Sequence, residues 1–207
     1  MILLSHPTGN QFVRAILKAL YEDGKLSEFN TSLSINAASF WLKLMPVNIQ
    51  KEFTRRSFDI PDNNIFTNPA LEIMRLFLPK IGLKKFVNQN SSLDVDAVYH
   101  SMDQFTSRRL VHLSKKREIR TVYSYEDGAL ETFTKAKELG IACVYDLPIA
   151  FWELGRKLML EEAERLPAWG NTLHNGIKIS KEKCERKNRE LALADVVVYP
   201  SKFVGDS

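Results

Sequence analysis

Hydrophobic and polar positions alternate along the chain with two different periods. The apolar run Ile2–Leu4 stands before a loop that contains Pro and Gly, as in a short buried strand. From Phe12 to Leu20 the apolar residues recur with helical spacing. The same succession of a short apolar strand and an amphipathic helix returns between Arg120 and Tyr199. The pattern therefore predicts repeated units of a strand followed by a helix.

The strands and helices that this pattern predicts together define a fold class. Short apolar strands that are each followed by a helix are typical of a parallel sheet covered on both faces. The sequence therefore predicts an α/β, Rossmann-like fold, with a mostly parallel sheet and helices on both faces. Between 40 and 87, where prolines interrupt the chain, the pattern predicts helices in pieces. We expect strands at 2–5, 29–34, 120–124, 141–145 and 195–199, and helices at 12–20, 70–78, 94–115, 128–139, 148–165 and 180–193.

Length, charge and cysteine content narrow the class of protein. A chain of 207 residues with 44% hydrophobic content is expected to form one domain, 1–207. The net charge of +4 is mild, and it does not indicate a nucleic-acid partner. Cys143 and Cys184 have neither metal-ligand nor disulfide-framework spacing, which favours a reducing compartment. Because no stretch approaches the roughly 20 apolar residues of a membrane span, we expect a cytoplasmic protein that is at most peripheral on the inner face of the membrane.

In sheets of this kind, ligands bind outside the carboxyl ends of the strands. The first such loop is "HPTGN", whose single glycine excludes the G-x-G-x-x-G signature of a dinucleotide site. Backbone N–H groups at the following helix start would hold a phosphate or hydroxyl, and Gly9 would permit its close approach. His6, Asn10 and Arg14 complete this candidate acceptor- or phosphate-binding set. The alternative is a tight turn in which Pro and Gly serve shape only and Arg14 is solvated.

Carboxylates follow two of the later predicted strands. Glu126 and Asp127 come after the strand at 120–124, and Asp146 follows the strand at 141–145. A carboxylate in this position would accept hydrogen bonds from sugar hydroxyls or act as a base. We take Asp146 and Glu126 as candidate catalytic residues and Asp127 as an acceptor-binding residue. The alternative is that Asp127 and Asp146 cap the helices that follow.

The histidines add little to this candidate chemistry. Their positions show no metal-ligand spacing, so no metal site is predicted, and only His6 lies in a loop at the ligand edge. The chain also lacks a P-loop and the G-x-S-x-G turn of a serine hydrolase. The four histidines are His6, His100, His112 and His174.

A basic and apolar region occupies the first half of the chain. Between Trp41 and Val87, eight basic and four acidic residues account for the whole net charge, and bulky apolar residues lie among them. We expect a helical basic and apolar insertion at 40–90. Such a surface would rest on an anionic membrane surface, where each base contributes about 1 kcal/mol. The alternative places the apolar residues in the core and the bases in water.

Three stretches taken together resemble a known family. They are "HPTGNQFVR", "VYSYEDGALETFTKAKELGIACVYDLPIAFW" and "EKCERKNRELALADVVVYPSKFVGDS". They look like the N-terminal domain of a GT-B fold glycosyltransferase, in the family that contains sucrose synthases and bacterial mannosyltransferases. The most specific piece is "LALADVVVYPSKFVGDS", because in that family a similar segment closes the N-terminal domain. The resemblance covers essentially the whole chain and is weakest between Trp41 and Val87.

The resemblance implies a function. It implies the acceptor-binding half of a retaining, metal-independent glycosyltransferase of polysaccharide biosynthesis, with a nucleotide sugar as co-substrate and no other cofactor. In such enzymes a glycine loop, matched here by Gly9, belongs to the acceptor domain. The donor is held by a C-terminal domain that we expect to be absent from this chain. The acceptor would be a glycan or a lipid-linked saccharide. Glu126 falls where relatives often have Glu, whereas Asp146 stands where many relatives have a sugar-contacting His.

Two other functions remain open at this point. The chain would also suit a non-catalytic ligand- or membrane-docking module or an inactive truncated fragment. A different nucleotide-binding enzyme on the same kind of sheet is disfavoured by the missing G-x-G-x-x-G. For the glycosyltransferase, a Gly9→Val substitution is expected to abolish transfer and leave the fold intact, because the new side chain would occupy the phosphate or acceptor position.

Overall fold

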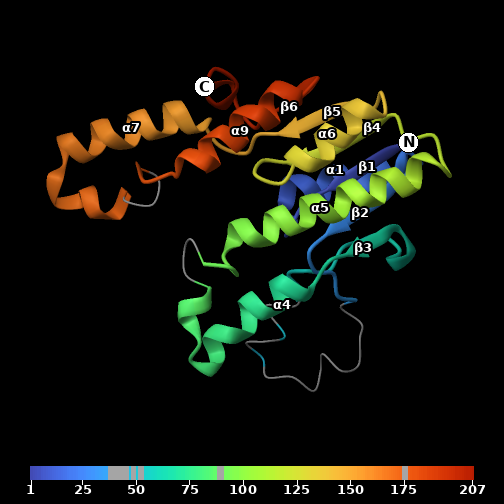
Figure 1. Ribbon diagram of the computed structural model, residues 1–207, viewed down its shortest axis with the longest axis horizontal. Helices are drawn as coiled ribbons and strands as arrows, with labels where there is room; N and C mark the ends of the chain where they lie inside the picture. The colour runs from blue at the N-terminus through green and yellow to red at the C-terminus, as the bar shows by residue number, and fades with distance from the viewer. Residues whose placement is uncertain (37–46, 48–49, 51–53, 88–90, 174–176) are drawn as a thin grey trace.

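The computed structural model describes residues 1–36, 47, 50, 54–87, 91–173 and 177–207 (Figure 1). The first part of the expected insertion, which includes Trp41 and Lys43, lies outside the described residues, and so does His174. The described chain forms one sheet with helices packed against it, and a lower lobe that carries α4 projects from the sheet (Figure 1).

A single six-stranded sheet organises the fold. All neighbouring strands pair in parallel, in the order β3-β2-β1-β4-β5-β6. This order reverses between β1 and β4, which makes the carboxyl ends of these two strands the switch point where ligands bind in such sheets. The strands are β1 (Ile2–Ser5), β2 (Leu26–Thr31), β3 (Ile65–Thr67), β4 (Thr121–Tyr125), β5 (Ala142–Asp146) and β6 (Val196–Val198).

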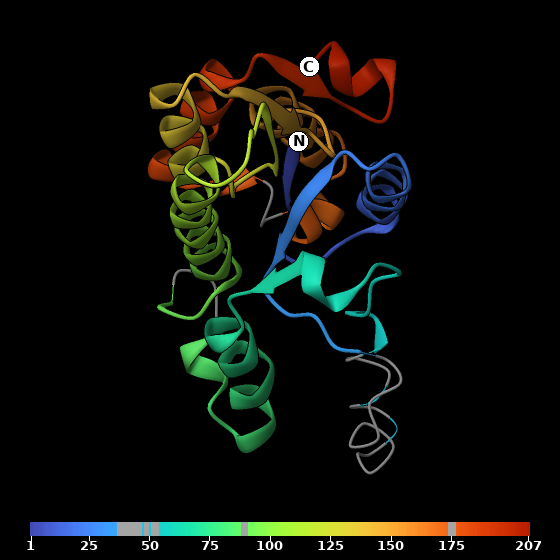
Figure 2. The same ribbon diagram turned by 90° about the vertical axis from the view of Figure 1, so that its right-hand side faces the viewer.

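The α-helices and shorter 3-10 turns connect the strands (Figures 1 and 2). The α-helices are α1 (Gln11–Glu22), α4 (Ala70–Phe77), α5 (Val95–Ser114), α6 (Leu130–Glu138), α7 (Trp152–Arg165), α9 (Lys181–Leu193) and α10 (Lys202–Gly205). The 3-10 turns are η1 (Asp62–Asn64), η2 (Leu78–Ile81), η3 (Lys84–Phe86) and η4 (Pro167–Leu173).

Helices cover both faces of the sheet, as the sequence predicts. On one face, Val13 of α1 packs in a cluster with Leu4 of β1. On the other face, Leu110 of α5 and Phe133 of α6 pack in a cluster with Leu3. Leu3 and Leu4 are adjacent on β1 and both fully buried, which occurs only in a strand with cover on its two sides. The α/β, Rossmann-like prediction is confirmed.

Two elements begin several residues from their predicted starts, and one helix was not predicted. The second strand is Leu26–Thr31 and not 29–34, because the buried carboxylate of Glu28 pairs with Arg109 of α5 and so lies inside the protein. The helix expected from Pro148 begins only at Trp152, since Phe151 still has extended ψ of 151°. The short helix α10 was not predicted.

The described part of the region between 40 and 90 contains a strand as well as helices. β3 pairs with β2 and so belongs to the sheet, which the prediction of helices alone missed. α4 is joined to the preceding segment by a buried ion-pair cluster, in which Glu72 binds Arg56 at 2.7 Å and Arg75 at 2.8 Å. These contacts tie the lower lobe to the main body.

Candidate functional site

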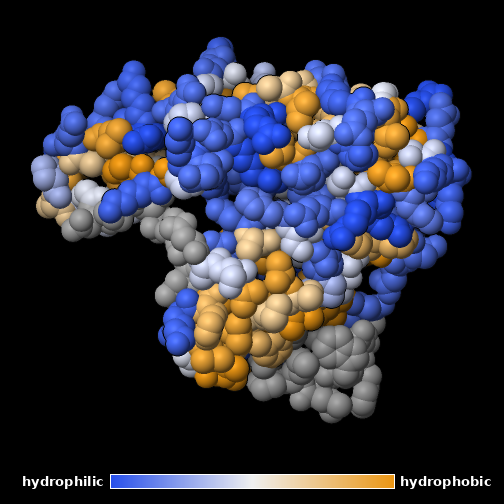
Figure 3. All heavy atoms as spheres, in the orientation of Figure 1, coloured by the Kyte–Doolittle hydropathy of each residue, from blue (hydrophilic) through white to orange (hydrophobic). Residues whose placement is uncertain are grey.

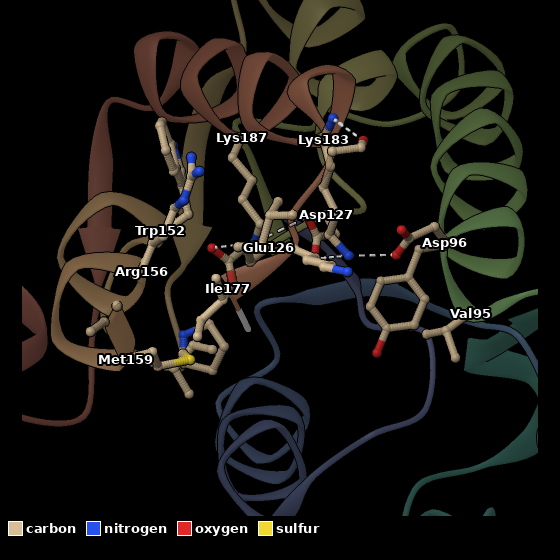
Figure 4. Close-up of a pocket in the computed structure, with 18 of the residues that line it drawn as sticks. Val95, Asp96, Glu126, Asp127, Trp152, Arg156, Met159, Ile177, Lys183 and Lys187 are labelled. Atoms are coloured by element: carbon tan, nitrogen blue, oxygen red, sulfur yellow. Dashed lines mark hydrogen bonds and ion pairs between the residues drawn. The ribbon is translucent and has the colours of Figure 1, made fainter. Parts of the chain in front are cut away.

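A cavity of about 680 Å³ lies where the carboxyl ends of β4 and β5 meet the first turns of α5, α7 and α9 (Figure 4). Its volume falls within the range of small-molecule sites. Lys183 and Lys187 of α9 reach toward Glu126 and Asp127, with Asp96 of α5 beyond them (Figure 4). The cavity thus occupies the edge of the sheet at which the sequence predicts ligands.

The floor of this cavity is formed by the carboxylates that follow β4. Glu126 is buried, and its carboxylate accepts a charged hydrogen bond from Lys187 Nζ at 2.7 Å. Burial raises the pKa of Glu126, while Lys187 acts in the opposite direction. Asp127 adopts a left-handed φ of 68° and lies 3.1 Å from Lys187 Nζ and 3.4 Å from Lys183 Nζ. The two predicted carboxylates therefore both face the cavity, each held by a lysine of α9.

Lys183 extends this charged row to α5. Its Nζ lies 2.6 Å from Asp96, in the first turn of that helix. Burial lowers the pKa of Lys183, but Asp127 and Asp96 raise it by more, so the ammonium stays charged. The row of alternating charges fixes the loop after β4 between α9 and α5, and it presents polar groups without a large net charge.

Two buried carboxylates hold the start of α6, directly behind the floor. Glu190 accepts hydrogen bonds from the N–H groups of Asp127 at 2.9 Å and of Ala129 at 3.1 Å. Asp103 accepts from the N–H groups of Glu131 and Thr132, at 2.7 and 2.8 Å. The alternative in which Asp127 caps this helix is therefore wrong, because other carboxylates occupy the N–H groups there.

Sequence reasoning missed these buried carboxylates. Glu190 lies on the same face of α9 as Lys183, Arg186 and Lys187, and Arg186 pairs with both Glu190 and Asp103. The spacing i, i+3, i+4, i+7 of these four charged residues is the spacing of a buried helix face. That signal was present in the sequence, although charges with this spacing are normally assigned to solvent.

Apolar and aromatic side chains also line the cavity. Trp152 and Met159 of α7 lie on one side of it together with Ile177 (Figure 4), and Tyr99 of α5 is a further lining residue. The Trp152 indole donates a hydrogen bond from Nε1 to Asn188 Oδ1 at 2.7 Å, which fixes the orientation of the ring. Aromatic and charged side chains around one space suit a ligand that has both apolar and polar faces.

Cations without a partner lie at the mouth of the same cavity. Arg156 and Lys178 are exposed lining residues, and neither forms an ion pair within the part of the chain that the structure describes. Their charges are available to a ligand, in contrast to those of Lys183 and Lys187.

Asp146 lies at the end of β5, just outside the lining. Its side chain is 7% exposed, and no hydrogen-bond partner of Oδ2 is found among the described residues. Burial raises the pKa of Asp146 to about 6, and the neighbouring Tyr123 hydroxyl acts in the opposite direction. A carboxyl that titrates near neutral pH is suited to proton transfer. The alternative role as a helix cap is wrong, because Phe151 occupies the N-cap position of α7.

The loop after β1 is packed in a different way. His6 Nδ1 accepts hydrogen bonds from the N–H groups of Gly9 at 2.7 Å and Thr8 at 3.2 Å. Burial, with a contribution from Arg14, lowers the pKa of His6 to about 3, so the ring is neutral. Two of the N–H groups that were expected to hold a phosphate therefore already have an acceptor inside the protein.

The remaining residues predicted in this loop also have internal partners. Asn10 caps α1, with Oδ1 accepting from Val13 N at 2.9 Å. The Arg14 guanidinium donates to the carbonyl groups of Ser57 and Arg55 and lies over the Phe58 ring, 4.6 Å from its centre. The alternative of a solvated Arg14 is therefore wrong.

Gly9 has a packing role that the sequence did not reveal. Its φ is +70°, and a Cβ at this position would lie 2.5 Å from a ring carbon of Phe58. A Gly9→Val substitution is therefore expected to strain this loop and to destabilise the fold, in contrast to the expectation from the sequence. None of His6, Gly9, Asn10 and Arg14 lines the 680 Å³ cavity, although the His6 ring lies 4.2 Å from the ring of Tyr125, which does line it.

In the part of the chain that the structure describes, no group of three or more His, Cys, Asp or Glu side chains is arranged to hold a metal ion. Among the described helices, none combines the length and the apolar content that crossing a membrane requires.

No protein-family model matches this sequence, and comparison with the curated proteins found no match. The resemblance to GT-B glycosyltransferases therefore stays a prediction. Function is therefore inferred from the residues and geometry of the cavity and not from the fold.

Proposed function

We propose that the chain is the acceptor-binding half of a nucleotide-sugar-dependent glycosyltransferase. The observation that carries this proposal is the cavity at the carboxyl ends of β4 and β5, which is lined by the aromatic rings of Trp152 and Tyr99 and by the carboxylates of Glu126 and Asp127. A saccharide has apolar C–H faces that pack on aromatic rings and hydroxyls that donate to carboxylates. Both kinds of partner face one space here.

The proposal assigns a role to each part of the cavity. Transfer forms a bond between the anomeric carbon of the donor sugar and an acceptor oxygen, breaks the bond to the leaving diphosphate and releases the hydroxyl proton. Glu126 faces the cavity and accepts the hydrogen bond of the reacting hydroxyl, while Lys187 holds its carboxylate in place. Asp146, one strand away, is the candidate to hold the released proton.

Binding of saccharides to the isolated chain tests the acceptor site. We expect mono- and oligosaccharides with a fitting polar face to raise the midpoint of thermal unfolding, because they bind only the folded state. Trp152→Ala should abolish this shift, whereas Trp169→Ala, an exposed tryptophan outside the cavity, should preserve it. A saturable shift with a nucleotide sugar alone, lost in Trp152→Ala, would make the cavity a donor site and contradict the proposal.

Transfer itself is tested in the organism that encodes the protein. Deletion of the gene is expected to remove one sugar from a cellular glycan, as seen by mass spectrometry, and the wild-type gene should restore it. Glu126→Gln should fail to restore the sugar at equal protein abundance, whereas Glu164→Gln, an exposed glutamate on α7, should succeed. Unchanged glycans after deletion would favour a saccharide-binding module without transferase activity.

A further inference from the structure

The lower lobe ends in a surface that mixes exposed apolar residues with lysines. This surface is formed by residues 80–86, here named the basic apolar tip, and it covers the end of η2 and all of η3. Ile81 is 68% exposed and Phe86 is 43% exposed, and Leu83 between them is exposed as well. In the space-filling view, hydrophobic residues dominate the lower lobe (Figure 3).

The backbone of the tip presents these side chains outward. Gly82 has a φ of +85° and ends η2, and Leu83 N donates a hydrogen bond to Leu78 O at 2.9 Å. This left-handed turn reverses the chain before η3 begins. The Lys85 ammonium lies 5.2 Å from the centre of the Phe86 ring, so a cation and an apolar ring are neighbours at the surface.

The charged side chains of the tip are all positive. No acidic residue occurs from Ile73 to Val87. Lys80, Lys84 and Lys85 are exposed, and within the described residues none of them is in an ion pair. Several exposed lysines elsewhere pair with a carboxylate four residues further along the chain, as in Lys157–Glu161, Lys181–Glu185 and Lys202–Asp206, whereas Lys115 and Lys116 after α5 are exposed without an ion pair among the described residues.

We propose that the basic apolar tip docks on the surface of an anionic phospholipid bilayer. Ile81, Leu83 and Phe86 would enter the boundary between headgroups and acyl chains, where amphipathic segments bury their apolar side. The three lysines would contact lipid phosphates from the same turn. A protein partner fits less well, because lysine is depleted in the cores of protein interfaces. This inference does not depend on the proposed glycosyltransferase activity.

The basic apolar tip lies close in sequence to a helix that lines the cavity. The tip precedes α5, whose first residues Val95 and Asp96 line the cavity. The tip and α7 also project on the same side of the sheet (Figure 1). Docking by the tip would therefore hold the mouth of the cavity close to the membrane surface.

Co-sedimentation with lipid vesicles tests the proposal. The full chain is expected to sediment with vesicles of phosphatidylcholine and phosphatidylglycerol, to release them as salt is raised, and to leave vesicles of phosphatidylcholine alone unbound. K84E/K85E should weaken the partitioning by at least about tenfold, given the contribution of each base near an anionic surface. The matched control is K115E/K116E, an exposed pair of adjacent lysines at the far end of α5, which should bind nearly as the wild type does.

The apolar contribution is tested in the same assay. Phe86→Ser should weaken binding to the anionic vesicles, whereas Phe203→Ser, at another exposed phenylalanine, should not. Equal thermal unfolding midpoints of all variants serve as the control for folding.

Several outcomes would overturn the proposal. The proposal is wrong if the protein does not bind anionic vesicles, or if it binds neutral vesicles equally well. It is also wrong if K84E/K85E and K115E/K116E lose the same amount of binding, because net charge alone would then explain the binding. A concentration-dependent dimer that Phe86→Ser abolishes would assign the tip to a second copy of the chain instead.

Discussion

Two loops at the same edge of the sheet carry residues with predicted functions, but their surroundings differ. The loop after β1, 6–10, is covered by Phe58, which lies against Gly9 and under Arg14. The loop after β4, 126–128, opens into the 680 Å³ cavity. Both loops lie at the switch point of the sheet, so topology alone does not explain which of them offers space for a ligand.

The two loops also differ in the groups that would hold an anionic part of a ligand. In the first loop the N–H groups of Thr8 and Gly9 are used by His6, and at the start of α6 Glu190 and Asp103 take the corresponding donors. Neither helix start therefore offers these donors to a phosphate. In the open loop the available positive charge comes from side chains at the mouth of the cavity.

The largest effect is expected at the carboxylate behind the open loop. Glu190→Ala removes the acceptor of three buried N–H groups and leaves Arg186 with one carboxylate fewer. Breaking such a buried ionic network costs about 3–5 kcal/mol of the free energy of unfolding. Urea unfolding followed by circular dichroism measures this change in the free energy of unfolding. We also expect the loop with Glu126 and Asp127 to lose its fixed position beside the cavity.

The matched control for this prediction is Glu185→Ala on the same helix. Glu185 forms only an exposed pair with Lys181, so its loss should change the free energy of unfolding by about 0.5 kcal/mol or less. Similar effects for the two variants would show that the buried network does not hold the loop.

The next effect tests whether the first loop is closed by packing. Gly9→Ala places a Cβ against Phe58 in a backbone with positive φ, which we expect to cost about 2–4 kcal/mol. Gly24→Ala has a similar φ of +64° but open space around the Cβ, so it should cost only about 1–2 kcal/mol. The difference between the two measured free energies isolates the clash with Phe58, and equal values would mean that this loop has room.

A pH-dependent effect is expected at Asp146, the last residue of β5, whose carbonyl accepts a hydrogen bond from Glu126 N of the open loop at 3.1 Å. Burial raises its folded-state pKa to about 6, above its ordinary value of 3.8. Its contribution to stability is therefore fully present below about pH 4 and is lost as pH rises to about 6, with a total of up to about 3 kcal/mol. Asp146→Asn should remove this loss and make the protein more stable than the wild type at pH 7.

Unfolding in urea at a series of pH values measures the difference between Asp146→Asn and the wild type. Asp59→Asn, at an exposed aspartate, should reproduce the wild-type dependence on pH. A constant difference between wild type and Asp146→Asn across the range would show that the pKa of Asp146 is the same in the folded and unfolded states, so that burial does not make it hold a proton near neutral pH.

Much of the fold could be predicted from hydrophobic periodicity because most strands are apolar. The strands β1, β4 and β5 were found to within one residue, since most of their buried side chains are hydrophobic. β2 was displaced because Glu28 is polar and yet buried against Arg109. β3 was missed because three half-buried residues give too short a pattern to recognise.

The site could be predicted only in part for a related reason. Glu126 and Asp127 were found because their position after a strand places them at the ligand edge. Trp152 and the buried Glu190 were not, because their roles depend on how α7 and α9 pack in three dimensions. An interpretation of the hydrophobic pattern assigns charged residues to the surface, whereas Glu190 is buried and accepts hydrogen bonds from backbone N–H groups.

The smallest effects compare the helix caps of the two regions. Asn10 caps α1 in the closed loop, and Ser180 caps α9 at the wall of the cavity, with Oγ accepting from Lys183 N at 3.2 Å. Replacement of either residue by Ala should cost about 1 kcal/mol of the free energy of unfolding, because each leaves an N–H group of the first turn without its acceptor. Only Ser180→Ala should weaken saccharide binding, since only Ser180 lines the cavity. The two variants are thus matched in stability and differ in their distance from the proposed ligand. Calorimetric titration with a binding saccharide measures the affinities. An equal loss of affinity in Asn10→Ala would indicate that the loop after β1 also belongs to the binding site.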